Sequence, residues 1–250
     1  MAKKSRNSKN HPHQGKENIV RPSSFKKDGW HPLDQAIDGR RDQKYVKNIK
    51  PRSEGQKSLI QSIKERSLTL AIGPAGTGKT YLAIASAVEA FENGEIERIV
   101  LSRPAMEAGE SLGYLPGDMQ EKMAPYLRPL YDSLGDRLGG KKVRQYLEDG
   151  TIEIAPIGFM RGRTLNNAFI VIDEAQNCTY GQLKMILSRL GWHSTMVITG
   201  DPDQSDLLEG ISGLAPIARK LKAVDNIGVC QLEQSDIVRH PLVAKMLNVL

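Results

Sequence analysis

The sequence has few cysteines, few aromatic residues and no long hydrophobic run. Its two cysteines, Cys178 and Cys230, lie far apart without CxxC or Cys/His spacing, which argues against a disulfide framework or a zinc site and favours two inert core residues. No stretch approaches the roughly twenty apolar residues that span a bilayer, and no apolar segment follows the polar N-terminus as in a signal peptide. We therefore expect a cytoplasmic protein without a membrane partner.

The net charge of +6 is concentrated at the start of the chain. Residues 1–50 contain 13 Lys/Arg and 5 Asp/Glu, a local net of +8, whereas the remainder contains 22 and 24, a net of −2. The same stretch is poor in apolar residues, so we expect 1–50 to be a basic, largely disordered tail. Such a tail either binds nucleic acid through its phosphates or is a solvated leader, and its composition leaves both interpretations open.

Residues 51–250 have the pattern of one α/β domain. Continuous apolar runs, typical of strands buried on both faces, recur at 68–72, 99–102, 152–154, 169–173, 196–199 and 227–232. Helix-like sequence separates them, including 54–66 and the alanine-rich 79–92. This alternation predicts a three-layer α/β fold with a mostly parallel central sheet.

Two segments depart from this alternation. Residues 104–117 contain three glycines and Pro116, which predicts a long loop. Residues 118–138 carry apolar side chains at helical spacing, but Pro125 and Pro129 predict that the helix breaks or restarts there.

The segment that says most about function is 73–80, GPAGTGKT, between a predicted strand and a predicted helix. It fits the phosphate-loop pattern GxxxxGK[ST], in which glycines let backbone N–H groups face phosphate oxygens at a helix N-terminus. Lys79 is expected to contact the β- and γ-phosphates, and the Thr80 hydroxyl to ligate Mg²⁺. The alternative is a glycine-rich turn before an ordinary helix. The predicted nucleotide-binding residues of this loop are Gly73, Pro74, Ala75, Gly76, Thr77, Gly78, Lys79, Thr80 and Tyr81.

A second apolar strand, about ninety residues downstream, ends in two carboxylates, Asp173 and Glu174. At a strand end Asp173 can hold Mg²⁺, and Glu174 can accept a proton from an attacking water, as in a Walker B strand. Such a pair standing alone would be interpreted as a helix cap. The phosphate loop upstream favours the catalytic interpretation.

A third strand runs into a polar turn at 198–204. Its Gln204 is predicted to orient the attacking water or sense the γ-phosphate, with Thr199 and Asp201 shaping the turn. An ordinary Asp-Pro turn is the alternative.

Three further side chains are candidates for contact with nucleotide. Arg239 is predicted to reach the γ-phosphate as an arginine finger, within its own subunit or across an interface, and Arg103 to do likewise or to contact nucleic acid. Gln56 precedes the phosphate loop on the first predicted helix and is a candidate for reading the adenine edge. For all three, a solvated surface side chain is the alternative.

Taken in order, these motifs resemble those of the PhoH-like family. The segments that carry the resemblance span about residues 51 to 250 and are SRPA (102–105), LGYLPGD (112–118), PYLRPLY (125–131), FMRGRT (159–164), IDEAQN (172–177), TGD with Gln204 (199–204) and DIVR (236–239). The resemblance implies a cytosolic ATP-binding protein of the P-loop NTPase (RecA/helicase-like) class, similar to the first motor domain of superfamily 1 helicases. It also implies a homo-oligomer, with a hexameric ring as one form, and a role near RNA in some members.

Our leading hypothesis is therefore a Mg²⁺-dependent ATPase, with coupling to RNA or another single-stranded nucleic acid as its extension. Its predicted catalytic residues are Lys79, Glu174, Gln204 and Arg239, and its predicted metal ligands are Thr80 and Asp173. A second hypothesis is a nucleotide-dependent RNA-binding or switch module that hydrolyses ATP slowly and binds nucleic acid through Arg161, Arg163, the 104–117 loop and the tail. A small-molecule kinase is a third, but the sequence has no recognisable basic lid or acceptor pocket.

Overall fold

The computed structural model describes residues 49–104, 119–208 and 210–238. The predicted basic tail and the predicted 104–117 loop lie almost wholly outside these residues, and Arg239 lies outside them as well.

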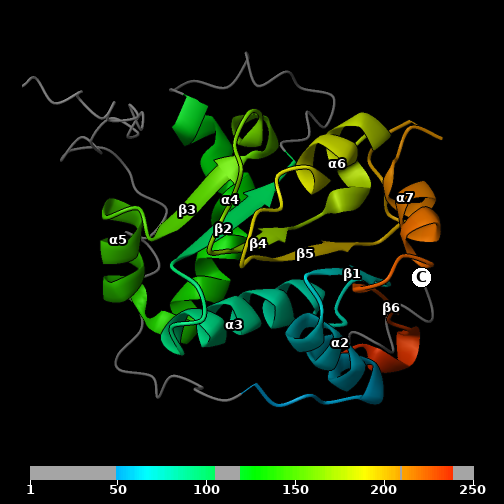
Figure 1. Cartoon of the computed structure of the whole chain (residues 1–250), viewed down its shortest axis with the longest axis horizontal. Helices are drawn as coiled ribbons and strands as arrows, with labels where there is room; N and C mark the ends of the chain where they lie inside the picture. Colours follow the sequence, from blue (N-terminus) through cyan, green and yellow to red (C-terminus); the bar gives the residue numbers. More distant parts are fainter. Residues whose placement is uncertain (1–48, 105–118, 209, 239–250) are drawn as a thin grey trace, which may run out of the picture. The chain divides into compact units, whose positions relative to one another are not determined.

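A single six-stranded sheet forms the centre of the described structure (Figure 1). Its strand order is β3-β2-β4-β5-β1-β6, and every described pair of neighbouring strands is parallel. The strands are β1 (Leu68–Ile72), β2 (Arg98–Arg103), β3 (Ile152–Pro156), β4 (Ala168–Ile172), β5 (Thr195–Gly200) and β6 (Ile227–Gln231). Each coincides with a predicted apolar run, so the three-layer α/β class is confirmed.

Two hydrophobic cores lie on opposite faces of the sheet. In β1, for example, Leu70 belongs to one core and Ala71 to the other, because successive side chains of a strand point to opposite faces. Both faces therefore need apolar residues, which explains why the strands appear in the sequence as continuous rather than alternating apolar runs.

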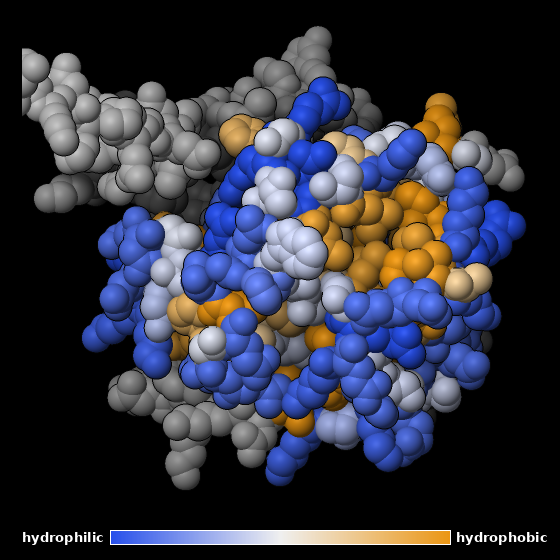
Figure 2. Space-filling model, in the orientation of Figure 1, coloured by the Kyte–Doolittle hydropathy of each residue, from blue (hydrophilic) through white to orange (hydrophobic). Residues whose placement is uncertain are grey.

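Helices cover both faces. The first core receives side chains from α2 (Glu54–Glu65), α3 (Lys79–Glu92), α4 (Met119–Leu138) and α5 (Gly140–Glu148). The second receives them from α6 (Tyr180–Leu187), α7 (Leu214–Leu221) and the short 3-10 turns η2 (Ile157–Met160) and η3 (Ala175–Asn177). Figure 2 shows hydrophobic surface on the side of the molecule that carries α6 and α7 in Figure 1. None of the helices in the described ranges is both long and apolar enough to span a bilayer.

The predicted break at Pro125 and Pro129 is wrong, because α4 runs without interruption through both prolines. Each proline lacks the N–H of a helical hydrogen bond, a loss of about 3 kcal/mol in an isolated helix interior. Leu130 and Leu134, both fully buried, pack with α3 in the first core and offset this loss. Tertiary packing thus overrides the local helix-breaking signal.

Candidate functional site

The candidate site lies at the carboxyl ends of β1, β4 and β5, which are neighbours in the sheet. The loop at 73–78 connects β1 to α3 at this edge, and Gly73 N–H donates to Gly200 O at 3.2 Å, which ties the loop to β5. A cavity of about 450 Å³ opens here. Its lining residues are Ala75, Gly76, Gly78, Lys79, Thr80, Tyr81, Arg103, Pro129, Ser133, Asp173, Glu174, Thr199, Gly200, Asp201 and Gln204.

The backbone of the loop favours glycine at three of its positions. Gly76 and Gly78 both have φ near +85°, a region that L side chains rarely adopt. At Gly73 a side chain would in addition collide with the backbone of Leu232, which follows β6. The glycines therefore serve the backbone geometry that a phosphate loop needs.

Lys79, the first residue of α3, lies over the loop. Its ammonium donates to Gly73 O at 2.6 Å and to Pro74 O at 2.8 Å, and the side chain is largely buried. A cation held inside a loop of peptide groups, at a helix N-terminus, is suited to bind an anionic phosphate chain.

Asp173 is the meeting point of three elements. Its Oδ1 accepts a hydrogen bond of 2.6 Å from the Thr80 hydroxyl on α3 and one of 2.7 Å from the Thr199 hydroxyl on β5. The side chain is buried, and its own N–H donates to Ser102 O at 2.8 Å. The two predicted metal ligands, Thr80 and Asp173, are thus in direct contact.

These ligands suit a magnesium ion. Mg²⁺ prefers hydroxyl, carboxylate and phosphate oxygens and needs only one or two protein ligands beside the phosphates and water. Thr80 and Asp173 supply a hydroxyl and a carboxylate on the wall of the cavity. In the described ranges no group of three or more His, Cys, Asp or Glu side chains is arranged to hold a metal without such outside ligands.

Glu174 is directed towards the cavity by an unusual backbone conformation. It has φ 53° and ψ 41°, the left-handed region, which costs a non-glycine residue about 1–2 kcal/mol. Its Oε2 accepts a hydrogen bond from Gln176 Nε2, and its Oε1 lies 3.5 Å from a guanidinium nitrogen of Arg103. Strained residues of this kind cluster at functional sites.

Arg103 links both carboxylates. Besides its contact with Glu174, it lies 3.7 Å from Asp173 Oδ2, and less than a quarter of its side chain is exposed. The structure therefore brings this predicted arginine into the site, opposite the carboxylates rather than in free solvent.

Gln176 is a site residue that sequence reasoning missed. It is buried, and its Nε2 donates to Glu174 Oε2 and to Gln204 O while its Oε1 accepts from Asp201 N–H at 3.1 Å. One side chain thus couples the end of β4 to the turn after β5 and sets the position of Gln204, which is exposed and lines the cavity. Its place two residues after the carboxylate pair was the available signal.

Gln56 lies behind the phosphate loop. Its Nε2 donates to Thr77 O at 2.9 Å, its Oε1 accepts from Arg52 N–H at 2.8 Å, and it is almost fully buried. One end of the amide thus braces the loop, and the other is fixed by the segment before α2. A contact of Gln56 with adenine stays a prediction.

Asp236, in the 3-10 turn η4 (Gln234–Asp236), holds the chain after β6 on the start of α2, a role that was not predicted. Hydrogen bonds from Glu233 N–H, the Ser53 hydroxyl and Gly55 N–H hold the pKa of its carboxyl below the usual range. Two residues later, Val238 N–H donates to Gly76 O at 2.9 Å. The chain after β6 is therefore anchored on the start of α2 and on the phosphate loop.

The predicted nucleic-acid pair, Arg161 and Arg163, does not line this cavity. Arg163 forms a bidentate ion pair with Glu153, with one N···O distance of 2.6 Å. The hydrogen bonds to Glu153 raise the pKa of Arg163. Arg161 is exposed. Only one of the two arginines is thus placed to meet a partner.

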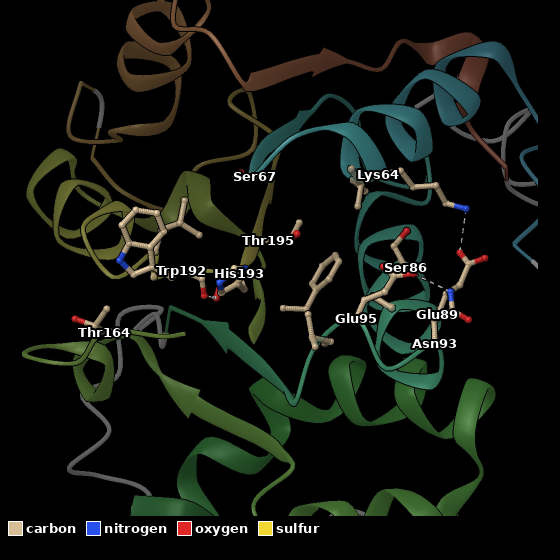
Figure 3. Close-up of a pocket in the computed structure, with 17 residues that line it drawn as sticks. Lys64, Ser67, Ser86, Glu89, Asn93, Glu95, Thr164, Trp192, His193 and Thr195 are labelled. Carbon is tan, nitrogen blue, oxygen red and sulfur yellow. Dashed lines mark hydrogen bonds and ion pairs between the residues drawn. The ribbon is translucent and has the colours of Figure 1, made fainter. Parts of the chain in front are cut away.

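A larger cavity, about 1040 Å³, lies at the opposite edge of the sheet, beside the amino ends of β4 and β5. Figure 3 shows Trp192 on one side of it and the ion pair of Lys64 with Glu89, 3.4 Å apart, on the other. None of the predicted site residues lies here.

The cysteines take no part in either cavity. Cys178 is fully buried in the second core, where burial raises the pKa of its thiol to about 12, and Cys230 is partly buried against the first core.

Several solved structures match part of this chain at low sequence identity and with TM-scores below 0.5. The large terminase from a thermophilic bacteriophage is 11% identical over a match that covers 80% of this chain and 50% of that chain, with a TM-score of 0.49. Pif1 helicase from Candida albicans is 13% identical, with 80% and 44% covered and a TM-score of 0.41.

Sequence relatives are much nearer. A PhoH-like protein of Bacillus subtilis (strain 168) is 54% identical over 203 residues, 81% of this chain and 64% of the relative. A PhoH-like protein of Synechocystis is 50% identical, with 80% and 61% covered, and Protein PhoH of Escherichia coli (strain K12) is 41% identical, with 86% and 61% covered. The chain thus spans less than two thirds of the length of these relatives. The sequence model of PhoH-like protein matches residues 48–250, and the chain belongs to that family.

Proposed function

We propose that this chain is a Mg²⁺-dependent ATPase that hydrolyses ATP to ADP and phosphate, with its turnover coupled to RNA or another single-stranded nucleic acid. The observation that carries the proposal is the 2.6 Å contact between Thr80 and Asp173, which joins the phosphate loop to the second strand motif across the sheet. If the glycine-rich segment were only a turn with no role in phosphate binding, nothing would require the Thr80 hydroxyl at its end to contact the buried carboxylate of Asp173.

Binding depends on the loop. The backbone N–H groups around Gly76 and Gly78 and the ammonium of Lys79 hold the triphosphate, while Thr80 and Asp173 are the side chains that would hold magnesium. When bound, magnesium would neutralise charge on the β- and γ-phosphates. These groups lie on elements that are fixed by packing, so little reorganisation is needed when nucleotide binds.

Hydrolysis depends on Glu174. Its carboxylate accepts the proton of a water whose oxygen bonds to the γ-phosphorus, while the bond to the β-phosphate oxygen breaks and ADP departs with that electron pair. Gln204, on the cavity wall, is proposed to orient this water. Gln176 contacts the carboxylate of Glu174 and the backbone carbonyl of Gln204, and so fixes the two residues relative to each other.

Two substitutions test the proposal. Lys79→Ala is expected to abolish measurable ATP binding in calorimetry with Mg²⁺. Glu174→Gln is expected to retain ATP binding and to lower the hydrolysis rate by about a hundredfold or more. Glu97→Gln, an exposed glutamate outside the cavity, is the matched control. Unchanged ATP affinity after Lys79→Ala overturns the site, and unchanged turnover after Glu174→Gln overturns the role of the base.

A nucleotide-dependent switch with slow hydrolysis is the second candidate function. The observation in its favour is that both Glu174 oxygens are engaged, one by Gln176 and one by Arg103. A base held in this way accepts a proton only after these contacts rearrange. ATP turnover that rises strongly with added RNA favours the ATPase coupled to nucleic acid. Turnover that is slow and insensitive to RNA favours the switch.

The proposal extends to a cytoplasmic homo-oligomer, with a hexameric ring as the specific hypothesis. It is supported by the family resemblance and by Arg239, which is proposed to reach the γ-phosphate of its own or a neighbouring subunit. Light scattering with and without ATP tests the assembly. Mixing Arg239→Ala with Glu174→Gln subunits tests the shared site, because activity recovers only if the arginine acts across an interface.

A further inference from the structure

The turn after β3 presents an aromatic ring to solvent. Phe159 in η2 is 65% exposed, whereas Ile157 and Met160 in the same turn are buried in the second core. Burial of a phenylalanine side chain is worth roughly 1.5–3 kcal/mol. Because its neighbours in the turn are anchored, the ring is held outward by the fold.

Hydrogen bonds brace this turn from both sides. The Arg163 guanidinium forms an ion pair with Glu153 of β3 and donates to Phe159 O at 3.5 Å. The Arg189 guanidinium donates to Arg163 O at 3.0 Å. Backbone bonds add to these contacts, with Arg161 N–H donating to Gly158 O. The exposed ring therefore sits on a pre-organised support, which lowers the entropic cost of binding through it.

Charge and space beside the ring suit an extended polyanion. Arg161 is exposed two residues from Phe159 and forms no ion pair with any residue in the described ranges. At Gly158 and Gly162, on either side, an added Cβ would meet nothing within 4 Å. A flat group can approach the ring while an anionic group beside it reaches the guanidinium.

The turn also lies at the correct edge of the sheet. It follows the carboxyl end of β3, and because the strands are parallel this is the edge that carries the phosphate loop, Asp173 and Glu174. The other strongly exposed aromatic side chain of the described residues, Trp192 at 82%, precedes β5 and so lies at the opposite edge.

We infer that this turn is a contact point for single-stranded nucleic acid, in which Phe159 stacks on an unpaired base and Arg161 pairs with an adjacent phosphate. Exposed aromatic rings beside cations are how single strands are bound without sequence preference. Arg163 and Glu153 act as positioning residues that touch the turn and not the strand. The inference rests on the proposed coupling of the ATPase to nucleic acid and names the surface that performs it.

Binding of a fluorescein-labelled oligouridylate to the full chain, followed by anisotropy at several salt concentrations, tests the inference. Phe159→Ala is expected to weaken binding roughly 10- to 100-fold, Phe159→Trp to retain it, and Phe159→Leu to weaken it like Ala, because leucine cannot stack. Arg161→Ala is expected to weaken binding. It is also expected to reduce the slope of log affinity against log salt concentration by about one, as for the loss of one phosphate contact. Trp192→Ala and Arg219→Ala, an exposed arginine on α7, are the matched controls.

Three outcomes overturn the inference. They are no binding of the oligonucleotide by the parent chain, equal losses for Phe159→Ala and Trp192→Ala, and full binding by Phe159→Leu, which would indicate an apolar protein contact. Basal ATP hydrolysis, measured on the same preparations without nucleic acid, keeps the proposed function separate. If it persists while nucleic-acid binding fails, this surface is misassigned and the hydrolytic site stands.

Discussion

The Thr80 hydroxyl donates a 2.6 Å hydrogen bond to Asp173 Oδ1, although the two residues are 93 positions apart in the chain. The contact forms because β1 and β4 both flank β5, so the residues that follow the two strands meet at one edge of the sheet. Thr199, at the end of β5, donates to the same oxygen. Residues at or after the ends of three neighbouring strands thus meet at one carboxylate.

Replacement of Thr80 tests the metal ligands. Thr80→Ala is expected to raise the Mg²⁺ concentration needed for half-maximal ATP binding by about 10- to 100-fold, because the hydroxyl ligand is lost. Thr80→Ser keeps the hydroxyl and is expected to remain near the parent value. Calorimetric titration of ATP at fixed Mg²⁺ concentrations measures the difference. Equal behaviour of the Ala and Ser variants would contradict the assignment.

Arg103 is expected to compete with the metal for Asp173. Removal of its guanidinium, 3.7 Å from Asp173 Oδ2, leaves the carboxylate more available to Mg²⁺. Arg103→Ala is therefore expected to bind ATP at several-fold lower Mg²⁺, in line with about 1 kcal/mol for a partly exposed ion pair. Its turnover reports on Glu174: a fall indicates that Arg103 orients the base, and a rise indicates that Arg103 holds the base inactive. An unchanged Mg²⁺ requirement, matching that of Arg219→Ala, argues against this role.

Gln56 distinguishes bracing of the loop from recognition of the base. Since its amide bonds Thr77 O and Arg52 N–H, Gln56→Ala is expected to weaken ATP and GTP binding equally, by about 3- to 10-fold for a lost hydrogen bond near 1 kcal/mol. Competition of the two nucleotides for the same variant measures this. A loss confined to ATP would instead support contact with the adenine edge.

Asp236 makes stability dependent on pH. Because its folded-state pKa lies below the usual range, the ionised carboxyl stabilises the fold above the unfolded pKa, and this stabilisation is lost as pH falls through the folded value. At pH 7 Asp236→Asn is expected to lower the free energy of unfolding by about 1–3 kcal/mol. The gap to the parent should shrink below about pH 4. Urea unfolding at several pH values tests this, and a gap that is independent of pH would exclude the ionised contact.

The strands of the fold, the phosphate loop and the carboxylate pair of the candidate site could be predicted from local sequence. The four inner strands, β1, β2, β4 and β5, follow from continuous apolar runs because both faces of each meet a core, whereas the edge strands β3 and β6 are only partly buried. The phosphate loop is equally local, because its glycines, Lys79 and Thr80 act through a backbone shape set within eight residues. The position of Asp173 and Glu174 beside the loop could also be predicted, because the carboxyl ends of parallel strands lie at one edge of the sheet.

What remained was decided by tertiary structure. The continuity of α4 through Pro125 and Pro129 depends on burial against α3, which no helix-breaking rule contains. Gln176 and Asp236 act through partners that come close only when strand ends and loops assemble. Arg163 supports the turn after β3 because it forms an ion pair with Glu153. Local sequence determines which backbone shapes and charges are available. The packing of distant segments determines which polar groups find each other, because a hydrogen bond acts over about 3 Å of space whatever the separation along the chain.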